Sequence, residues 1–142
     1  MIWNISKKNI ISKMPVVAAG FCDRGRGMIG RDFCDFDAMV FHRCGAVHTM
    51  FMSINLDIVF LDRENRICGI NEKTAPWKFL IRKPGAVTVI EMPEGIIART
   101  DSEVGDFVDL NAELADKKIL FNGRLDVVVP TATAISFKSE NL

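Results

Sequence analysis

The stretch "KKILFNGRLDVVV" constrains the fold of this chain more than any other local pattern. Two runs of β-forming residues flank Asn122-Gly123. A two-residue type I′ turn needs positive φ at both central positions, and Asn-Gly adopts these angles at the least cost. The pattern predicts a β-hairpin across residues 118–129, and Pro130 then ends its second strand.

Short strand-like runs recur along the rest of the chain, separated by Gly, Pro and polar residues. The expected strands cover residues 2–6, 14–21, 37–41, 47–54, 56–62, 67–70 and 87–92, and another strand is expected after a turn at Gly105-Asp106. A hairpin is expected over residues 56–70, and helical turns around residues 93–101 and 110–118. The glycine-rich residues 22–33 are expected to form one or two helical turns or a tight loop. The expected fold is mainly β. It is a compact single domain over residues 1–142, barrel-like or sandwich-like, with one or two short helices and a C-terminal β-hairpin.

The charge balance argues against polyanionic partners. Lys plus Arg number 18 and Asp plus Glu number 18, so the whole chain has no net attraction for nucleic acid or membrane. No apolar run reaches the length of a membrane span, and Lys13 interrupts the stretch that a secretory signal would need. The four cysteines form no C-x-x-C pair, as expected for reduced thiols in a cytoplasmic protein. We expect a monomer or dimer that needs no cofactor.

Several segments resemble a known family in their order and spacing. They are "RGMIGR" (26–31), "VHTMFMSINLDIVFLDRENRI" (47–67), "PW" (76–77), "VIEMPEG" (89–95) and "VGDFV" (104–108). They are similar to the uncharacterised prokaryotic family called domain of unknown function 192, over roughly residues 17–110. The resemblance implies a compact, mainly β, barrel-like fold, and it implies no activity, substrate or catalytic residue. Residues 111–142, with the expected hairpin, form an extension beyond it.

His48, Met50 and Met52 alternate along one expected strand, so their side chains would share one face. An imidazole and two thioethers suit copper(I), with Cys44 as a fourth ligand. The same residues also fit a packed strand, in which methionines fill gaps in the core. We favour the packed strand and keep soft-metal binding as an alternative function.

Asp57 interrupts the apolar run "LDIVFL", so its carboxylate needs a partner or solvent. His48 is one of two histidines and would be the natural group for acid–base chemistry near neutral pH. A His48–Asp57 pair is equally consistent with a satisfied structural pair and with a catalytic unit. A hydrolase-type enzyme that uses this pair is therefore a second alternative function.

The remaining candidates could bind a ligand. Arg26 and Arg31 flank glycines, and backbone N–H groups of such turns can cradle an anion that arginines reinforce. Trp77 has basic neighbours, which suits stacking on a ligand as well as burial in the core. Glu91 lies among apolar residues, where a bridge to Arg31 or Arg82 would satisfy it.

No nucleophile motif or phosphate-binding loop occurs in the sequence. The favoured function is therefore a non-catalytic binding module for a small anionic ligand or a protein partner. The candidate ligand-binding residues are Arg26, Arg31, His48, Asp57, Trp77 and Glu91.

Overall fold

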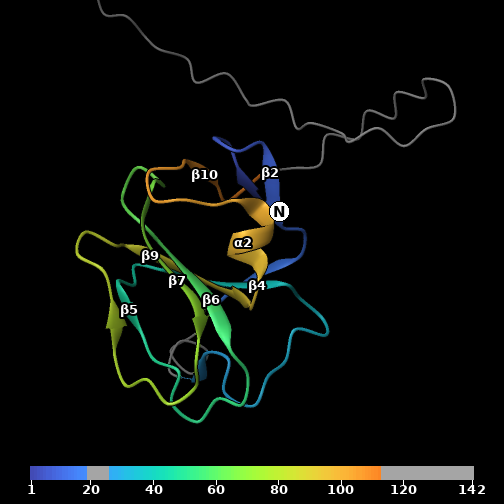
Figure 1. Ribbon diagram of the computed structural model, residues 1–142, viewed down its shortest axis with the longest axis vertical. Helices are drawn as coiled ribbons and strands as arrows, with labels where there is room; N and C mark the ends of the chain where they lie inside the picture. Colours follow the sequence, from blue (N-terminus) through green and yellow to red (C-terminus); the bar gives the residue numbers. More distant parts are fainter. Residues whose placement is uncertain (19–25, 113–142) are drawn as a thin grey trace, which may run out of the picture. The chain divides into compact units, whose positions relative to one another are not determined.

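A five-stranded sheet forms the centre of the computed structural model, which describes residues 1–18 and 26–112 (Figure 1). The strand order is β3-β4-β9-β6-β7. The bounds are β3 Pro15–Val17, β4 Ala38–His42, β9 Thr88–Pro93, β6 Leu56–Leu61 and β7 Ile67–Thr74. The pair β3–β4 is parallel, and the other neighbours are antiparallel.

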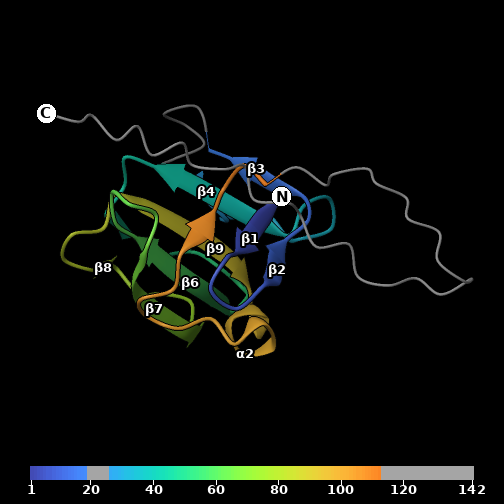
Figure 2. The ribbon, with the colours of Figure 1, turned by 90° about the horizontal axis from the view of Figure 1, so that it is seen from above.

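Two smaller sheets and one short helix accompany the central sheet. The first has the order β10-β1-β2, formed by Val108–Asp109, Ile2–Asn4 and Asn9–Ser12. The second pairs β5 (Ala46–Val47) with β8 (Ile81–Arg82). The helix α2 spans Ile96–Thr100. Figure 2 shows β10, β1 and β2 grouped over one face of the central sheet.

Both faces of the central sheet are covered, because alternate residues of each strand point to opposite sides. One side packs under α2 and the sheet β10-β1-β2, and we call it the α2 face. Its sheet residues include Val40, Val59, Leu61, Ile90 and Met92. The other side packs under β5, β8 and the segments before and after β4, and we call it the loop face. Its sheet residues include Phe41, Ile58, Phe60 and Val89, with Met28 and Met52 packed against them. All six residues of β6 are buried as a result.

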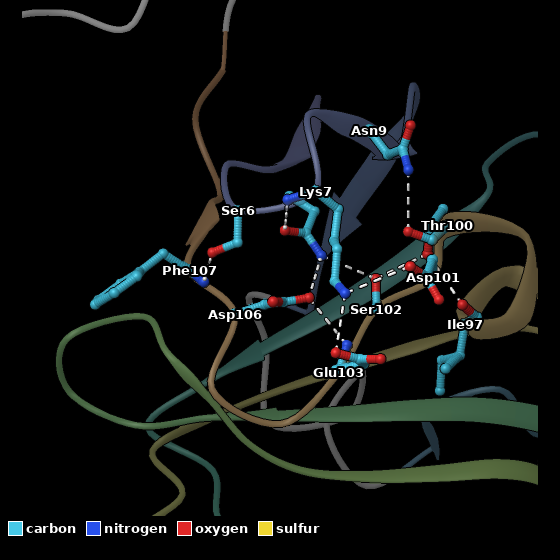
Figure 3. Close-up of polar contacts among 11 residues, drawn as sticks. Ser6, Lys7, Asn9, Ile97, Thr100, Asp101, Ser102, Glu103, Asp106 and Phe107 are labelled. Carbon is cyan, nitrogen blue, oxygen red and sulfur yellow. Dashed lines mark hydrogen bonds and ion pairs between the residues drawn. The ribbon is translucent and has the colours of Figure 1, made fainter.

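Buried polar contacts join the start of the described chain to its end. Asn4 Nδ2 donates to Ser102 Oγ at 3.1 Å and to Asp106 Oδ2 at 2.9 Å. Lys7 Nζ lies 2.9 Å from a carboxylate oxygen of Glu103 (Figure 3). These contacts hold the sheet β10-β1-β2 against the segment that follows α2.

The structure confirms the mainly β fold, the hairpin over residues 56–70 and the helical turn within residues 93–101. The arrangement is sandwich-like. No closed barrel forms among residues 1–18 and 26–112, where β3 and β7 are open edges of the central sheet. The strands β2 and β8 were not predicted. The chain divides after Ala112 into two units, of which the structure describes the first. The predicted hairpin over 118–129 and most of the helix over 110–118 lie outside the described residues.

The predicted strand over residues 47–54 is wrong. The strand β5 ends at Val47, and the chain then turns at Phe51, where φ is +62°. The hydrogen bonds of Thr49 hold the chain in this turn. Thr49 is buried, its backbone N–H donates to the carbonyl oxygen of Lys78 at 2.8 Å, and its hydroxyl donates to the carbonyl oxygen of Ala75 at 2.8 Å. These bonds fix residues 48–54 as a loop.

Candidate ligand-binding pocket

A cavity of about 110 Å³ lies on the loop face of the central sheet. We call it the Glu91 pocket. Its lining residues are Gly27, Phe41, Cys44, Ala46, Val47, His48 and Glu91. They come from β4, β5, β9 and the segments beside them, so the pocket forms where the long loops close over the sheet.

Glu91 lies in the middle of β9, opposite Met39 of β4 and Ile58 of β6. The residue is 2% exposed, and its Oε2 atom has no hydrogen-bond partner among the described residues. Burial raises the pKa of Glu91 to about 8, because a charged carboxylate is poorly solvated there. Neither Arg31 nor Arg82 forms the expected bridge to it, so the carboxyl group is mainly protonated at neutral pH.

His48 brings a second unsatisfied polar atom to the pocket. It directly follows β5, and its Nδ1 atom is buried with no hydrogen-bond partner in the part of the chain that the structure describes. Cys44 lies beside it, and its thiol donates to the carbonyl oxygen of Ala46 at 3.0 Å. Buried polar atoms in native proteins nearly always have a partner, so two such atoms on one cavity indicate a place for a ligand.

Gly27 also lines the pocket, close to Glu91. The φ of Gly27 is +51°, and a Cβ atom there would lie 3.7 Å from the Phe41 ring and 3.9 Å from Glu91 Oε2. A larger side chain at this position would therefore grow into the pocket.

Asp57 does not join His48, and the predicted pair is not formed. Asp57 alternates with Val59 and Leu61 on the α2 face, whereas the Glu91 pocket lies on the loop face. Its carboxylate accepts hydrogen bonds from the backbone N–H groups of Lys73, Gly95 and Ile97, at 2.8–3.0 Å. Asp57 is thus a structural residue that caps the start of α2.

The two arginines also lie outside the Glu91 pocket. Arg26 is exposed, and its Nε donates to the carbonyl oxygen of Ile29 at 3.0 Å. Arg31 lines a separate open hollow that it shares with Asp32 and Asp35. Two carboxylates beside one guanidinium make that hollow a poor match for an anion.

Trp77 lies on the surface and not in the core. Its side chain is 60% exposed and meets the Phe51 ring edge-on, with the ring centroids 5.1 Å apart. It lines none of the hollows described above.

The proposed soft-metal residues are not aligned. Met52 is buried in the core of the loop face, and the loop from His48 to Met52 removes the shared strand face on which the prediction rested. No group of three or more His, Cys, Asp and Glu side chains arranged to hold a metal occurs in the part of the chain that the structure describes.

Comparison with known proteins places the chain in a family. The model of the family DUF192, described as "Uncharacterized ACR", matches residues 5–110. The chain belongs to the DUF192 family. The UPF0127 protein of Thermococcus sibiricus is 29% identical over 119 residues, which are 80% of this chain and 76% of that protein. The UPF0127 protein PF1050 of Pyrococcus furiosus is 33% identical over 66 residues, 46% of this chain and 56% of its own.

A solved structure shares the fold of this DUF192 chain. The protein of unknown function from Novosphingobium aromaticivorans superposes with a TM-score of 0.60 at 24% identity, covering 67% of this chain and 73% of its own. Among residues 1–18 and 26–112, no helix is long and apolar enough to cross a membrane.

The sequence of this DUF192 chain identified Glu91 and His48 as candidate ligand-binding residues, but it did not predict that they line the same pocket. Both residues can be recognised in the sequence because each is a titratable residue among apolar neighbours. Gly27, Phe41 and Val47 carry no such signal, because wall residues of a cavity look like ordinary core and turn residues in a sequence.

Proposed function

We propose that this protein is a binding module for a small, uncharged polar molecule, held in the Glu91 pocket. One observation carries the proposal: Glu91 Oε2 and His48 Nδ1 are both buried without a partner, and both residues line the same cavity. Each unsatisfied buried group costs about 1–3 kcal/mol, and a ligand that hydrogen-bonds to both atoms recovers that cost.

The size of the pocket limits the ligand to a few heavy atoms. A cavity of roughly 150 Å³ holds one benzene molecule, and the Glu91 pocket measures about 110 Å³. A molecule with the size and polarity of acetamide fits this volume.

The lining of the pocket favours a neutral ligand over the anion that the sequence suggested. No Lys or Arg of residues 1–18 and 26–112 lines it, and the carboxyl group of Glu91 is mainly protonated at neutral pH. A protonated carboxyl group donates one hydrogen bond and accepts another, which is the pattern that a primary amide complements.

A titration with acetamide, acetate and methylammonium at pH 7 and constant ionic strength tests the proposal. We expect acetamide to raise the melting temperature and to shift the imidazole NMR signals of His48. The exposed His42 serves as an internal reference whose signals stay in place. A stronger response to acetate, or no response of His48 to any of the three, would contradict the proposal.

Filling the pocket provides the control. Asn tolerates the positive φ of Gly27, so Gly27→Asn places a side chain toward Glu91 and should abolish the response to acetamide. Gly30→Asn is the matched variant, since Gly30 has φ +65° in the same segment but does not line the pocket. It should respond as the unsubstituted protein does.

A further inference from the structure

A second hollow, unrelated to the Glu91 pocket, lies along the outer edge of β7. It measures about 570 Å³ and runs between residues 71–75 and residues 78–83. We call it the β7 groove. Figure 2 shows β8 next to β7 at that edge of the molecule. The stem of Lys83 packs over Gly69, where a Cβ atom would lie 2.5 Å from Lys83 Cγ, and so closes one end of the groove.

The groove is strongly basic although the chain as a whole is neutral. Its charged lining residues are Lys73, Lys78, Arg82 and Lys83 against the single acid Glu72. Lys78, Arg82 and Lys83 form no ion pair with any described residue. Lys73 has only a distant partner, Glu94, at 3.9 Å. Four cations with this little neutralisation attract a negatively charged occupant.

Hydrogen-bonding groups of the groove point to a polypeptide as that occupant. β7 is the last strand of the central sheet, and its outer edge bonds to residues 105–106 at Ile67 only, so the edge beside the groove is open. Among the described residues β8 pairs with β5 alone, which leaves its other edge open. Such edges accept a further extended chain. Asn71, at the groove, has a buried Oδ1 atom that finds no partner within residues 1–18 and 26–112 and so needs a hydrogen-bond donor. A peptide supplies N–H donors, whereas phosphate groups of a lipid or nucleic acid supply acceptors.

Apolar side chains stand beside the groove. Phe51, Trp77, Phe79 and Leu80 are between 59% and 79% exposed, and the rings of Phe51 and Trp77 touch. Exposed clusters of large apolar residues with a polar rim mark interaction sites. Trp, Phe and Arg are enriched at protein interfaces, and Trp and Arg are among the residues that contribute most of the binding energy.

We propose that the β7 groove binds an extended acidic segment of a partner protein, with apolar side chains of that segment resting on Phe51, Trp77 and Phe79. The acidic side chains meet the four cations, and the segment's backbone donates to Asn71 Oδ1. This partner site is independent of the ligand in the Glu91 pocket.

A designed peptide tests the inference. The probe is a blocked peptide of alternating Glu and Val with a central Phe, and its counterpart carries Lys in place of Glu. We expect the acidic peptide alone to bind and to shift the fluorescence of the exposed Trp77 to shorter wavelength, while the buried Trp3 contributes a constant background. The affinity should fall as salt rises, because the contacts are ionic.

Charge reversal locates the site. Lys78→Glu with Arg82→Glu should weaken binding at least about tenfold, as expected when close charge pairs become repulsive. The matched control reverses two exposed cations elsewhere, Lys13→Glu with Arg63→Glu, and should leave binding unchanged. Asn71→Ala should weaken binding several-fold without changing its salt dependence.

Three outcomes would overturn the inference. They are absence of acidic-peptide binding at about 1 mM, equal loss of affinity in both charge-reversed variants, and preference for oligothymidine or for vesicles of phosphatidylcholine and phosphatidylglycerol over the peptide. The last outcome would assign the surface to nucleic acid or membrane instead.

Discussion

Glu91 and Asp57 are both buried carboxyl groups, and their surroundings give them different chemistry. Asp57 accepts three backbone hydrogen bonds, a number that solvates a carboxylate well. Glu91 has no such donors, and burial raises its pKa to about 8. The two residues lie on neighbouring strands, where Asp57 pairs with Met92, one residue beyond Glu91. That single step along the strand sends the two side chains to opposite faces of the sheet.

The raised pKa of Glu91 makes the stability of the protein depend on pH. In the unfolded chain the group titrates near 4.5, so between pH 4.5 and 8 the folded state holds the additional proton. The free energy of unfolding must therefore fall as the pH rises through that interval, by at most about 1.4 kcal/mol per pH unit, and level off above it.

Glu91→Gln removes this dependence. Urea unfolding of both proteins at pH 5, 6, 7 and 8 measures it. The difference in free energy of unfolding, native minus variant, should decrease steadily across the series. Parallel curves for the two proteins would show that Glu91 is solvated or paired.

At the scale of elements, Asp57 connects β6 to α2. The helix has five residues, and its N-cap residue Gly95 offers no side chain for capping. The carboxylate of Asp57 takes this role by accepting from the N–H groups of Gly95 and Ile97.

Asp57→Ala should lower the free energy of unfolding by about 2–4 kcal/mol, because it leaves three N–H groups without their acceptor. Asp57→Asn should cost less, since the amide keeps one accepting oxygen. Denaturant unfolding measures both, with the exposed Glu64→Ala as the neutral control. A cost for Asp57→Ala no larger than that of the control would contradict the capping role.

The strands and turns that were predicted correctly are encoded by residues close to one another in the sequence. The hairpin of β6 and β7 has a β-branched run, a polar turn and a second run, and each part acts within a few residues. The strand predicted over residues 47–54 does not form, because the alternation of apolar and polar residues there does not reflect the two faces of a strand. Met52 fills the core, His48 lines a pocket and Thr49 bonds to residues 75–78. Two-residue strands such as β5 and β8 exist only through their partner and leave no pattern of their own.

The pocket was less predictable than the fold, for a reason of geometry. Whether Glu91 or Asp57 meets His48 depends on which face of the sheet each side chain takes, and that depends on the register between strands. Register follows from contacts between distant segments, such as Glu91 opposite Met39. The sequence identified both acids as unusual, but it associated His48 with Asp57, whereas Glu91 is the acid that lines the same pocket as His48.

At the scale of the whole molecule, Asn4 is the main polar link between the two ends of the described chain. It is fully buried and bonds to Ser102 and Asp106, across 98 and 102 residues of sequence. Asn4→Ala should lower the free energy of unfolding by about 1–3 kcal/mol by leaving these groups unsatisfied.

Asn9→Ala is the matched comparison. Asn9 is exposed and makes one bond, to the carbonyl oxygen of Thr100, so its loss should cost less. Hydrogen exchange should show faster exchange at β1 and β10 in Asn4→Ala, with β6 and β9 unchanged. Uniformly faster exchange through every strand would contradict a local link.

The pairing of β1 with β10 also means that β1 cannot complete its sheet until the chain has been synthesised as far as β10. β1 and β2 are close in sequence and can pair as soon as both leave the ribosome, but an isolated hairpin is only marginally stable. The core cluster that buries Ile2 and Ile11 also includes Ile97 and Val108, so it is complete only when α2 and β10 have been made, roughly a hundred residues later. During that interval the nascent chain exposes the apolar side chains of this hairpin. Chaperones can bind them, and they can also form non-native contacts that lead to misfolding.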